Sequence, residues 1–205
     1  MTGPAVRSRL LVLRRNRAAA ERGRELLEQK HEVLLRELLR RQHVLEAVAA
    51  QVTAALTEAR TLLRAAQIEL GRAVIDAAVL AQRETAPVEL RTRTLLGVAL
   101  PGLRGQSPAF RPSYAPGGTA ESLDRAGAAF AALLPRLARL AEEDVAVRNL
   151  QRGLAKTLRR LNALDKIVLP HLDGEIHAVT SALEEEERDE AFRHKRWLAA
   201  HRARA

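Results

Sequence analysis

The sequence predicts an all-α protein in which two long helices form an antiparallel, left-handed coiled coil with a short irregular or β-hairpin insert at the turn end. Two observations predict this class. Apolar residues recur at helical spacing on both sides of residues 85–118, whereas that central stretch is rich in proline and glycine. We therefore expect an N-terminal long helix over residues 1–84, an insert lobe over 85–118, and a C-terminal long helix over 119–205.

The composition supports long helices rather than a large globular core. Of the 205 residues, 47% are hydrophobic and 29% are charged, which is enough apolar content for a folded chain. Leu, Ala, Arg and Glu dominate, as they do in coiled coils. Aromatic residues make up only 2%, which argues against both a large core and a base-stacking surface.

Other bulk properties narrow the function. The chain has no cysteine, so it can form neither disulfides nor thiolate metal sites. No apolar stretch reaches the length of a bilayer span, and we expect no direct membrane insertion. The formal net charge of +9 favours acidic partners, whether nucleic acid, membrane headgroups or an acidic protein surface.

In the first helix, an apolar seam with alternating spacings of three and four residues continues for many turns. Sustained a/d spacing of this kind favours a left-handed coiled coil. Alanines near the end of the seam would let the paired helices approach closely. The seam comprises Leu10, Leu13, Ala20, Leu27, Leu34, Leu38, Leu45, Val48, Val52, Ala55, Ala59, Leu62 and Ala66.

The same spacing rule predicts a seam in the second helix. It comprises Leu133, Leu137, Leu140, Val147, Leu154, Leu158, Leu161, Val168 and Leu172. Pro170 lies inside this helix, between the seam positions Val168 and Leu172, and is expected to remove one intrahelical hydrogen bond and bend the helix locally. The apolar positions then continue at Ile176, Val179 and Leu183, two successive steps of four residues that predict a local unwinding of the supercoil.

The insert is predicted to contain a short strand over residues 94–100, with 109–110 or 113–114 as its partner. Thr119 follows two glycines and is expected to cap the start of the second helix. Because the insert forms the turn between the helices, the two termini are expected to meet at the opposite end.

No catalytic constellation is present, and we expect a non-catalytic protein without cofactor or metal. None of the six histidines is followed by another at i,i+4, and no H-E-x-x-H motif occurs. Basic residues cluster near both termini, and an antiparallel hairpin would bring both clusters to one tip. That tip fits binding within a protein socket. Two alternatives are a basic coiled coil that binds nucleic acid through phosphate neutralisation and a homo-oligomeric structural rod.

Three segments carry a resemblance to a known family. They are residues 10–30 with LLVL and AERGRELLEQK, residues 159–170 (RRLNALDKIVLP), and residues 187–196 (ERDEAFRHKR). In this order, and over nearly the whole chain, the sequence resembles the D subunit of the V-type (archaeal/vacuolar-type) rotary ATPases and ATP synthases. Asp165 departs from the glutamate more usual in the family.

The resemblance implies a central-stalk rotor axle that transmits torque between the catalytic hexamer and the ion-translocating ring. Its implied partners are the A and B subunits of the hexamer, the F subunit, and the funnel-shaped stalk subunit above the membrane ring, with no nucleic acid. The implied location is cytoplasmic, peripheral on the inner face of the plasma membrane. The complex would make ATP, or would use ATP to drive proton or sodium transport.

Candidate partner-binding residues follow from this assignment. For contact with the hexamer we expect the terminal tip: Leu10, Leu13, Arg14, Arg17, Phe192, Lys195, Arg196 and Trp197. For contact with the stalk partners we expect the insert, around Leu100, Leu103 and Phe110.

Overall fold

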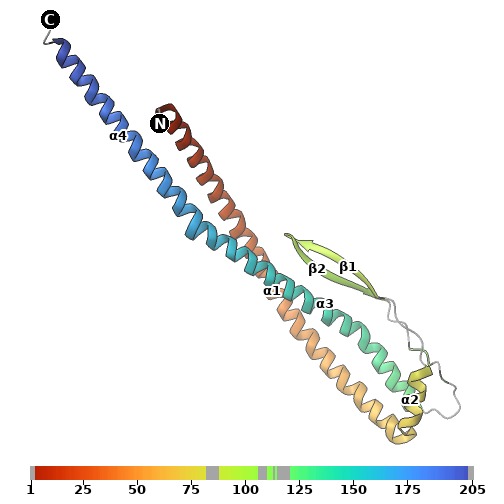
Figure 1. The fold of residues 1–205 in the computed structure, drawn as a ribbon. Coiled ribbons are helices and arrows are strands. Elements are labelled where there is room, and N and C mark those ends of the chain that lie inside the picture. Colours follow the sequence, from red (N-terminus) through yellow and green to blue (C-terminus); the bar gives the residue numbers. More distant parts are fainter. Residues whose placement is uncertain (1–2, 82–87, 106–109, 113, 115–120, 203–205) are drawn as a thin grey trace. The chain divides into compact units, whose positions relative to one another are not determined.

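The computed structural model describes residues 3–81, 88–105, 110–112, 114 and 121–202 (Figure 1). Thr119, the expected helix cap, lies outside these residues, as do the remaining parts of the insert. The elements in chain order are α1 (Gly3–Leu70), α2 (Arg72–Ala81), β1 (Val88–Leu95), β2 (Val98–Gly105), α3 (Glu121–Ala163), the π-helix η1 (Leu164–Val168) and α4 (Leu169–Arg202). The predicted class, long helices with a β-hairpin insert, is confirmed.

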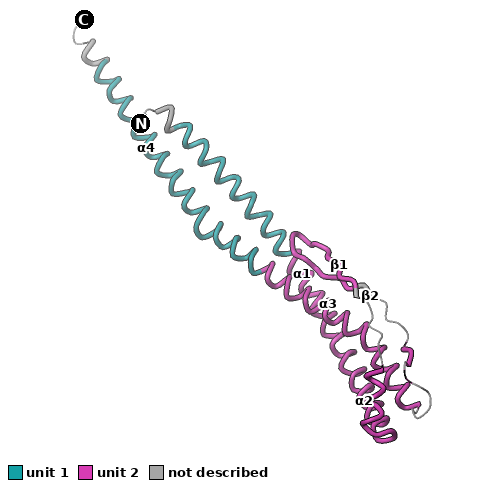
Figure 2. Tube along the Cα trace, turned by 45° about the vertical axis from the view of Figure 1, so that its right-hand side comes forward, with its two compact units in different colours: residues 1–32, 155–205 teal, residues 33–154 magenta. Residues whose placement is uncertain are grey.

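The chain forms two compact units, and each combines parts of both helical arms (Figure 2). Unit 1 comprises Met1–Glu32 and Ala155–Ala205, and unit 2 comprises Val33–Leu154. These units therefore cut across the three segments expected from the sequence.

In unit 1, the first part of α1 runs antiparallel to α4. Leu13 and Leu183 are buried between the two helices, and Leu172, Ile176 and Val179 are half-buried along the same stretch. The sequence predicted four of these apolar positions, around and after the change of seam phase: Leu172, Ile176, Val179 and Leu183. Burial of one narrow apolar stripe per helix drives this pairing.

The change of phase coincides with a π-helix. In η1 the backbone N–H of Leu169 donates to the carbonyl oxygen of Leu164, five residues back rather than four. Pro170 follows directly and has no N–H to donate. The wider turn accommodates one extra residue, which rotates the following apolar positions back onto the paired helix.

In unit 2, the remainder of α1 pairs with α3 through three apolar clusters. The first joins Leu34 and Leu38 of α1 to Ala146, Val147 and Leu150 of α3. From residue 7 onward, where burial is described, every buried apolar residue of α1 belongs to the predicted seam, which is thereby confirmed. These residues are Leu13, Leu34, Leu38, Val48, Val52, Ala59 and Ala66.

The predicted seam of the second arm is partly wrong. Leu158 is 44% exposed, and Leu137 and Val168 are exposed too, whereas Leu150 and Thr157 are buried. After Leu140, successive positions of the predicted seam are spaced by four and then three residues. Successive positions on the buried face of the helix are instead spaced by three and then four residues. The reason is a second packing partner, because the β-hairpin covers α3 beside α1 and draws further residues into the core.

The hairpin also differs from its prediction. β1 and β2 pair antiparallel, with Leu95 opposite Val98 and only Leu96 and Gly97 between them. Both turn residues have positive φ, 48° and 80°, as a two-residue turn of type I′ requires. The turn therefore interrupts the predicted strand 94–100, and the strand that pairs with β2 is Val88–Leu95. Leucine is an uncommon residue at positive φ, so the sequence contains a weak turn signal here.

The first arm is not one helix to residue 84, because Gly71 ends α1. Gly71 has φ 76°, and its N–H donates to the Gln67 carbonyl oxygen at 3.1 Å. A left-handed glycine of this kind is a common helix stop. After it, α2 packs Ile75 and Ala78 against Ala66 of α1 and Leu123 of α3.

Close packing of the hairpin on α3 generates a first prediction. A Cβ added at Gly153 would lie 2.5 Å from Val98 Cγ2. We expect Gly153→Ala to lower the free energy of unfolding by about 1–3 kcal/mol through overpacking, less the gain in helix propensity. Thermal unfolding measures this change.

Gly23→Ala is the matched control. Gly23 is also helical, but a Cβ there would meet nothing within 4 Å. We expect this variant to gain about 0.5–1 kcal/mol. A Gly153→Ala protein as stable as Gly23→Ala would contradict the close packing.

Candidate partner-binding surfaces

The basic N-terminal residues lie opposite acidic residues of the second arm within unit 1. Arg7 contacts Glu187 at 2.9 Å, Arg9 contacts Glu175 at 3.4 Å, and Arg24 contacts Asp165 at 3.5 Å. Arg17 pairs with both Asp173 and Glu21. These pairs are largely exposed and screened by solvent, so each contributes little to stability. Together they indicate the register of the two helices.

This register separates the two basic clusters, which were expected to share one tip. Because Arg7 lies opposite Glu187, the chain beyond about residue 191 passes the start of α1, as Figure 1 shows. The basic residues Arg193, Lys195 and Arg196 therefore lie on a single projecting helix, while four of the N-terminal arginines face carboxylates of the second arm.

The predicted tip residues consequently fall into two groups. Leu13 is buried and Arg17 is held by carboxylates, so both help to join the helices. Leu10 is half-buried and Arg14 is exposed on the same stretch of α1. On the projecting end of α4, Phe192 is 64% and Trp197 is 55% exposed.

The exposed aromatic residues on α4 are accompanied by positive charge. Lys195 and Arg196 are exposed beside Trp197, whose ring stacks on His194 with centroids 6.4 Å apart. An apolar and cationic helix end of this kind is suited to a partly acidic protein surface.

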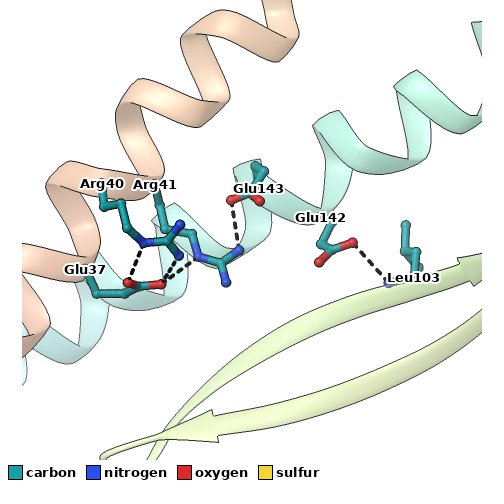
Figure 3. A network of polar contacts seen from close by, with 6 residues as sticks. All are labelled: Glu37, Arg40, Arg41, Leu103, Glu142 and Glu143. Atoms are coloured by element: carbon teal, nitrogen blue, oxygen red, sulfur yellow. Dashed lines mark hydrogen bonds and ion pairs between the residues drawn. The ribbon is translucent and has the colours of Figure 1, made fainter.

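In unit 2, an ion-pair network fixes α1 against α3 (Figure 3). Glu37 accepts hydrogen bonds from Arg40 at 2.6 Å and from Arg41 at 2.9 Å, and Arg41 also donates to Glu143 of α3 at 2.8 Å. The side chains of Arg41 and Glu143 are only 17% and 12% exposed. Hydrogen bonds from Arg40, opposed by partial burial and reinforced by Arg41, lower the pKa of Glu37 to about 2.

The predicted stalk-end residues are mostly engaged inside unit 2. Leu100 is buried in the cluster between α1 and α3. The backbone N–H of Leu103 donates to Glu142 at 3.3 Å, as Figure 3 shows. The ring of Phe110 lies on Gly127, where a Cβ would come within 2.2 Å of it. These three residues thus attach the insert to the helices.

Sequence reasoning missed an apolar surface around the end of α1. Ile68 is 88% exposed, and Leu80 and Val79 of α2 are 84% and 65% exposed. On the inner side of α2, Tyr114 packs near Leu123 and donates a hydrogen bond to Asp124. The signal was present, since Gly71 is followed by an unusually dense apolar run that exceeds one buried face.

The described residues contain no group of three or more His, Asp or Glu side chains placed to hold a metal ion. None of the helices in the described ranges is long and apolar enough to cross a membrane.

Comparison with known proteins agrees with this arrangement. The family of ATP synthase D subunits matches residues 9–199 of the chain. The chain is 30% identical to the D subunit of the A-type ATP synthase of Pyrococcus horikoshii and 31% identical to that of Pyrococcus furiosus, in each case over 97% of this chain and 94% of the relative. The corresponding D subunit of Methanopyrus kandleri is 29% identical over 93% of this chain and 83% of the relative.

The long paired helices define a coiled-coil subunit, and the ATP synthase D subunits that the chain resembles are non-catalytic stalk subunits. The match over residues 9–199 shows that the chain belongs to the family of ATP synthase D subunits, the central-stalk subunits of A/V-type rotary ATP synthases. Nothing in these comparisons supports the nucleic-acid-binding or structural-rod alternative.

The network around Glu37 generates a second prediction, on acid stability. A carboxyl whose pKa falls on folding adds stability that is present above its unfolded pKa, near 4.5, and is lost as the pH falls toward 2. We expect Glu37→Gln to lower the unfolding free energy at pH 7 by about 1 kcal/mol, allowing for solvent screening. Its stability should also fall less between pH 4.5 and 2.

Urea unfolding at several pH values measures both effects. Glu25→Gln, a change of the same kind at an exposed position of the same helix, serves as the control. An identical pH dependence of Glu37→Gln and the wild-type chain would contradict the role assigned to Glu37.

Proposed function

We propose that this chain acts as the rotor axle that carries torque between the catalytic hexamer of A and B subunits and the ion-translocating ring in the membrane. The observation that carries this proposal is the family match over residues 9–199. The relatives are named as D subunits of A-type ATP synthases, which supports an A-type complex as its setting. In it the chain binds no nucleotide and contributes no bond chemistry.

The helix pairing supports a mechanical role. In unit 1, α1 and α4 differ in sequence and length, so the pair has no rotational symmetry about its axis. An unsymmetrical shaft offers different contacts to each catalytic interface as it turns. Only such differential contacts can shift the conformational equilibrium of a partner.

The terminal tip is the part of the axle that engages the hexamer in this proposal. Phe192, Lys195, Arg196 and Trp197 on the projecting end of α4 make the direct contacts, because their side chains are exposed. Leu10 and Arg14 of α1 add to the same surface. Leu13 and Arg17 contribute by holding α1 against α4.

The other partners, the F subunit and the funnel-shaped stalk subunit, bind unit 2 in this proposal. Leu100, Leu103 and Phe110 shape the insert for those contacts by fixing it to α3. The exposed apolar side chains of Ile68, Val79 and Leu80 provide an additional docking surface. Through these partners the chain is held, peripherally, on the cytoplasmic face of the plasma membrane.

Coupling measurements on the reconstituted complex test the proposal, and they provide our third prediction. We expect the double change Phe192→Ala and Trp197→Ala to leave the hexamer assembled. Ions pumped per ATP hydrolysed should fall about tenfold, the effect of losing about 1.4 kcal/mol of differential contact. Truncation of the chain after residue 188 should have a larger effect in the same direction.

The matched control is the conservative pair Phe192→Leu and Trp197→Phe, which keeps apolar contact area. It should retain most of the coupling. Full coupling in both the alanine variant and the truncated complex would refute the proposed role of the tip.

A further inference from the structure

The two edges of the β-hairpin differ, and the register shows how. Leu95 and Val98 flank the two-residue turn and exchange backbone hydrogen bonds, and such pairs then alternate with non-bonded ones along the ladder. Three of the non-bonded pairs are Thr94 with Ala99, Thr92 with Pro101, and Leu90 with Leu103. The backbone polar groups of these six residues therefore point outward, toward the two edges of the hairpin.

The β2 edge is covered by α3, which bonds to two of its backbone groups. The side-chain amide of Asn149 donates to the Ala99 carbonyl oxygen at 2.9 Å, and Glu142 accepts from the Leu103 N–H at 3.3 Å. Between them, Pro101 has no N–H that would need an acceptor. On this edge the outward N–H of Leu103 is therefore paired, and Pro101 has none.

The β1 edge has no comparable cover among the residues that the structure describes. Its eight residues pair with β2 without a bulge, and it contains no proline. Leu90 is 70% exposed, and Thr92, Arg93 and Thr94 are exposed as well. Protein sheets usually shorten, bulge or cover an edge strand of this length. An open edge of this kind is a template for an added strand.

The side chains of β1 indicate the chemistry of that strand. Arg91 and Arg93 occupy alternate positions and so lie on one face of the hairpin. Glu89 shares this face and lies 3.8 Å from Arg91, whereas the exposed Arg93 has no ion pair among the residues that the structure describes. Across an antiparallel pair, opposite charges stabilise and like charges destabilise.

We propose that the outer edge of β1 binds an extended, acidic segment of another protein as a third strand of the sheet. Main-chain hydrogen bonds to Leu90, Thr92 and Thr94 provide affinity, and carboxylates opposite Arg91 and Arg93 provide specificity. This inference goes beyond the proposed axle function, because it assigns a binding mode and a chemical class of partner to the outer edge of the hairpin.

Binding of synthetic peptides to the full chain tests the proposal, and is our fourth prediction. The probe is a short peptide alternating glutamate with valine, and the control probe alternates lysine with valine. The acidic peptide should bind and should slow amide hydrogen exchange at Leu90, Thr92 and Thr94 about tenfold or more, as new backbone hydrogen bonds form. The lysine peptide should not.

Two substitutions at one position isolate the main-chain contribution. Thr92→Pro removes an outward N–H without removing a bond to β2, and we expect it to weaken peptide binding about tenfold. Thr92→Val keeps the N–H and should bind as the wild-type chain does. Unchanged exchange at Val98 and Leu100 in the proline variant would show that the hairpin stays folded.

A charge exchange tests the specificity independently of any proline effect. The double change Arg91→Glu and Arg93→Glu should transfer binding from the glutamate peptide to the lysine peptide. Equal binding of both peptides to the wild-type chain, no protection of the three β1 amides, or failure of the charge exchange would each overturn the proposal. Because the isolated chain is used, these outcomes do not depend on rotary coupling.

Discussion

The structure depends on the burial of one narrow apolar stripe on each long helix. A stripe of this width excludes water only when a second helix covers it, so each helix depends on its partner for most of its stability. In unit 2 that requirement is met by three separate clusters spaced along α1 and α3. Three alanines, Ala59, Ala66 and Ala146, are fully buried, and side chains this small leave room for the helices to pack closely.

Polar contacts between the helices have a different role from the apolar clusters. Exposed pairs such as Arg7 with Glu187 contribute little energy, but they favour the observed register because sliding the helices would break them. The partly buried pair of Arg41 and Glu143 has greater weight, because an unpaired charge at that depth is costly. Hydrophobic burial therefore stabilises the helix pairs, and the ion pairs favour one register between them.

The seam of α1 could be predicted from sequence because one regular repeat, read against one helical partner, determines which residues are buried. α3 was harder, since α1 and the hairpin both cover it and Val98 and Leu100 change which face is buried. The turn at Leu96 and Gly97 left almost no signal, because leucine rarely takes positive φ. Residues 192–197 were chosen as a tip from the family resemblance, but their projection beyond α1 depends on the register, which only coordinates define.

The π-helix at Leu164–Val168 has a consequence for how the last segment can vary. One residue more or fewer in an α-helix turns everything downstream by about 100° around the axis. At η1 the wider turn already holds such an extra residue, and the angular phase of Leu172 through Leu183 depends on it. A single peptide unit, distant from the end of the chain, thereby sets the direction in which every later side chain of α4 points.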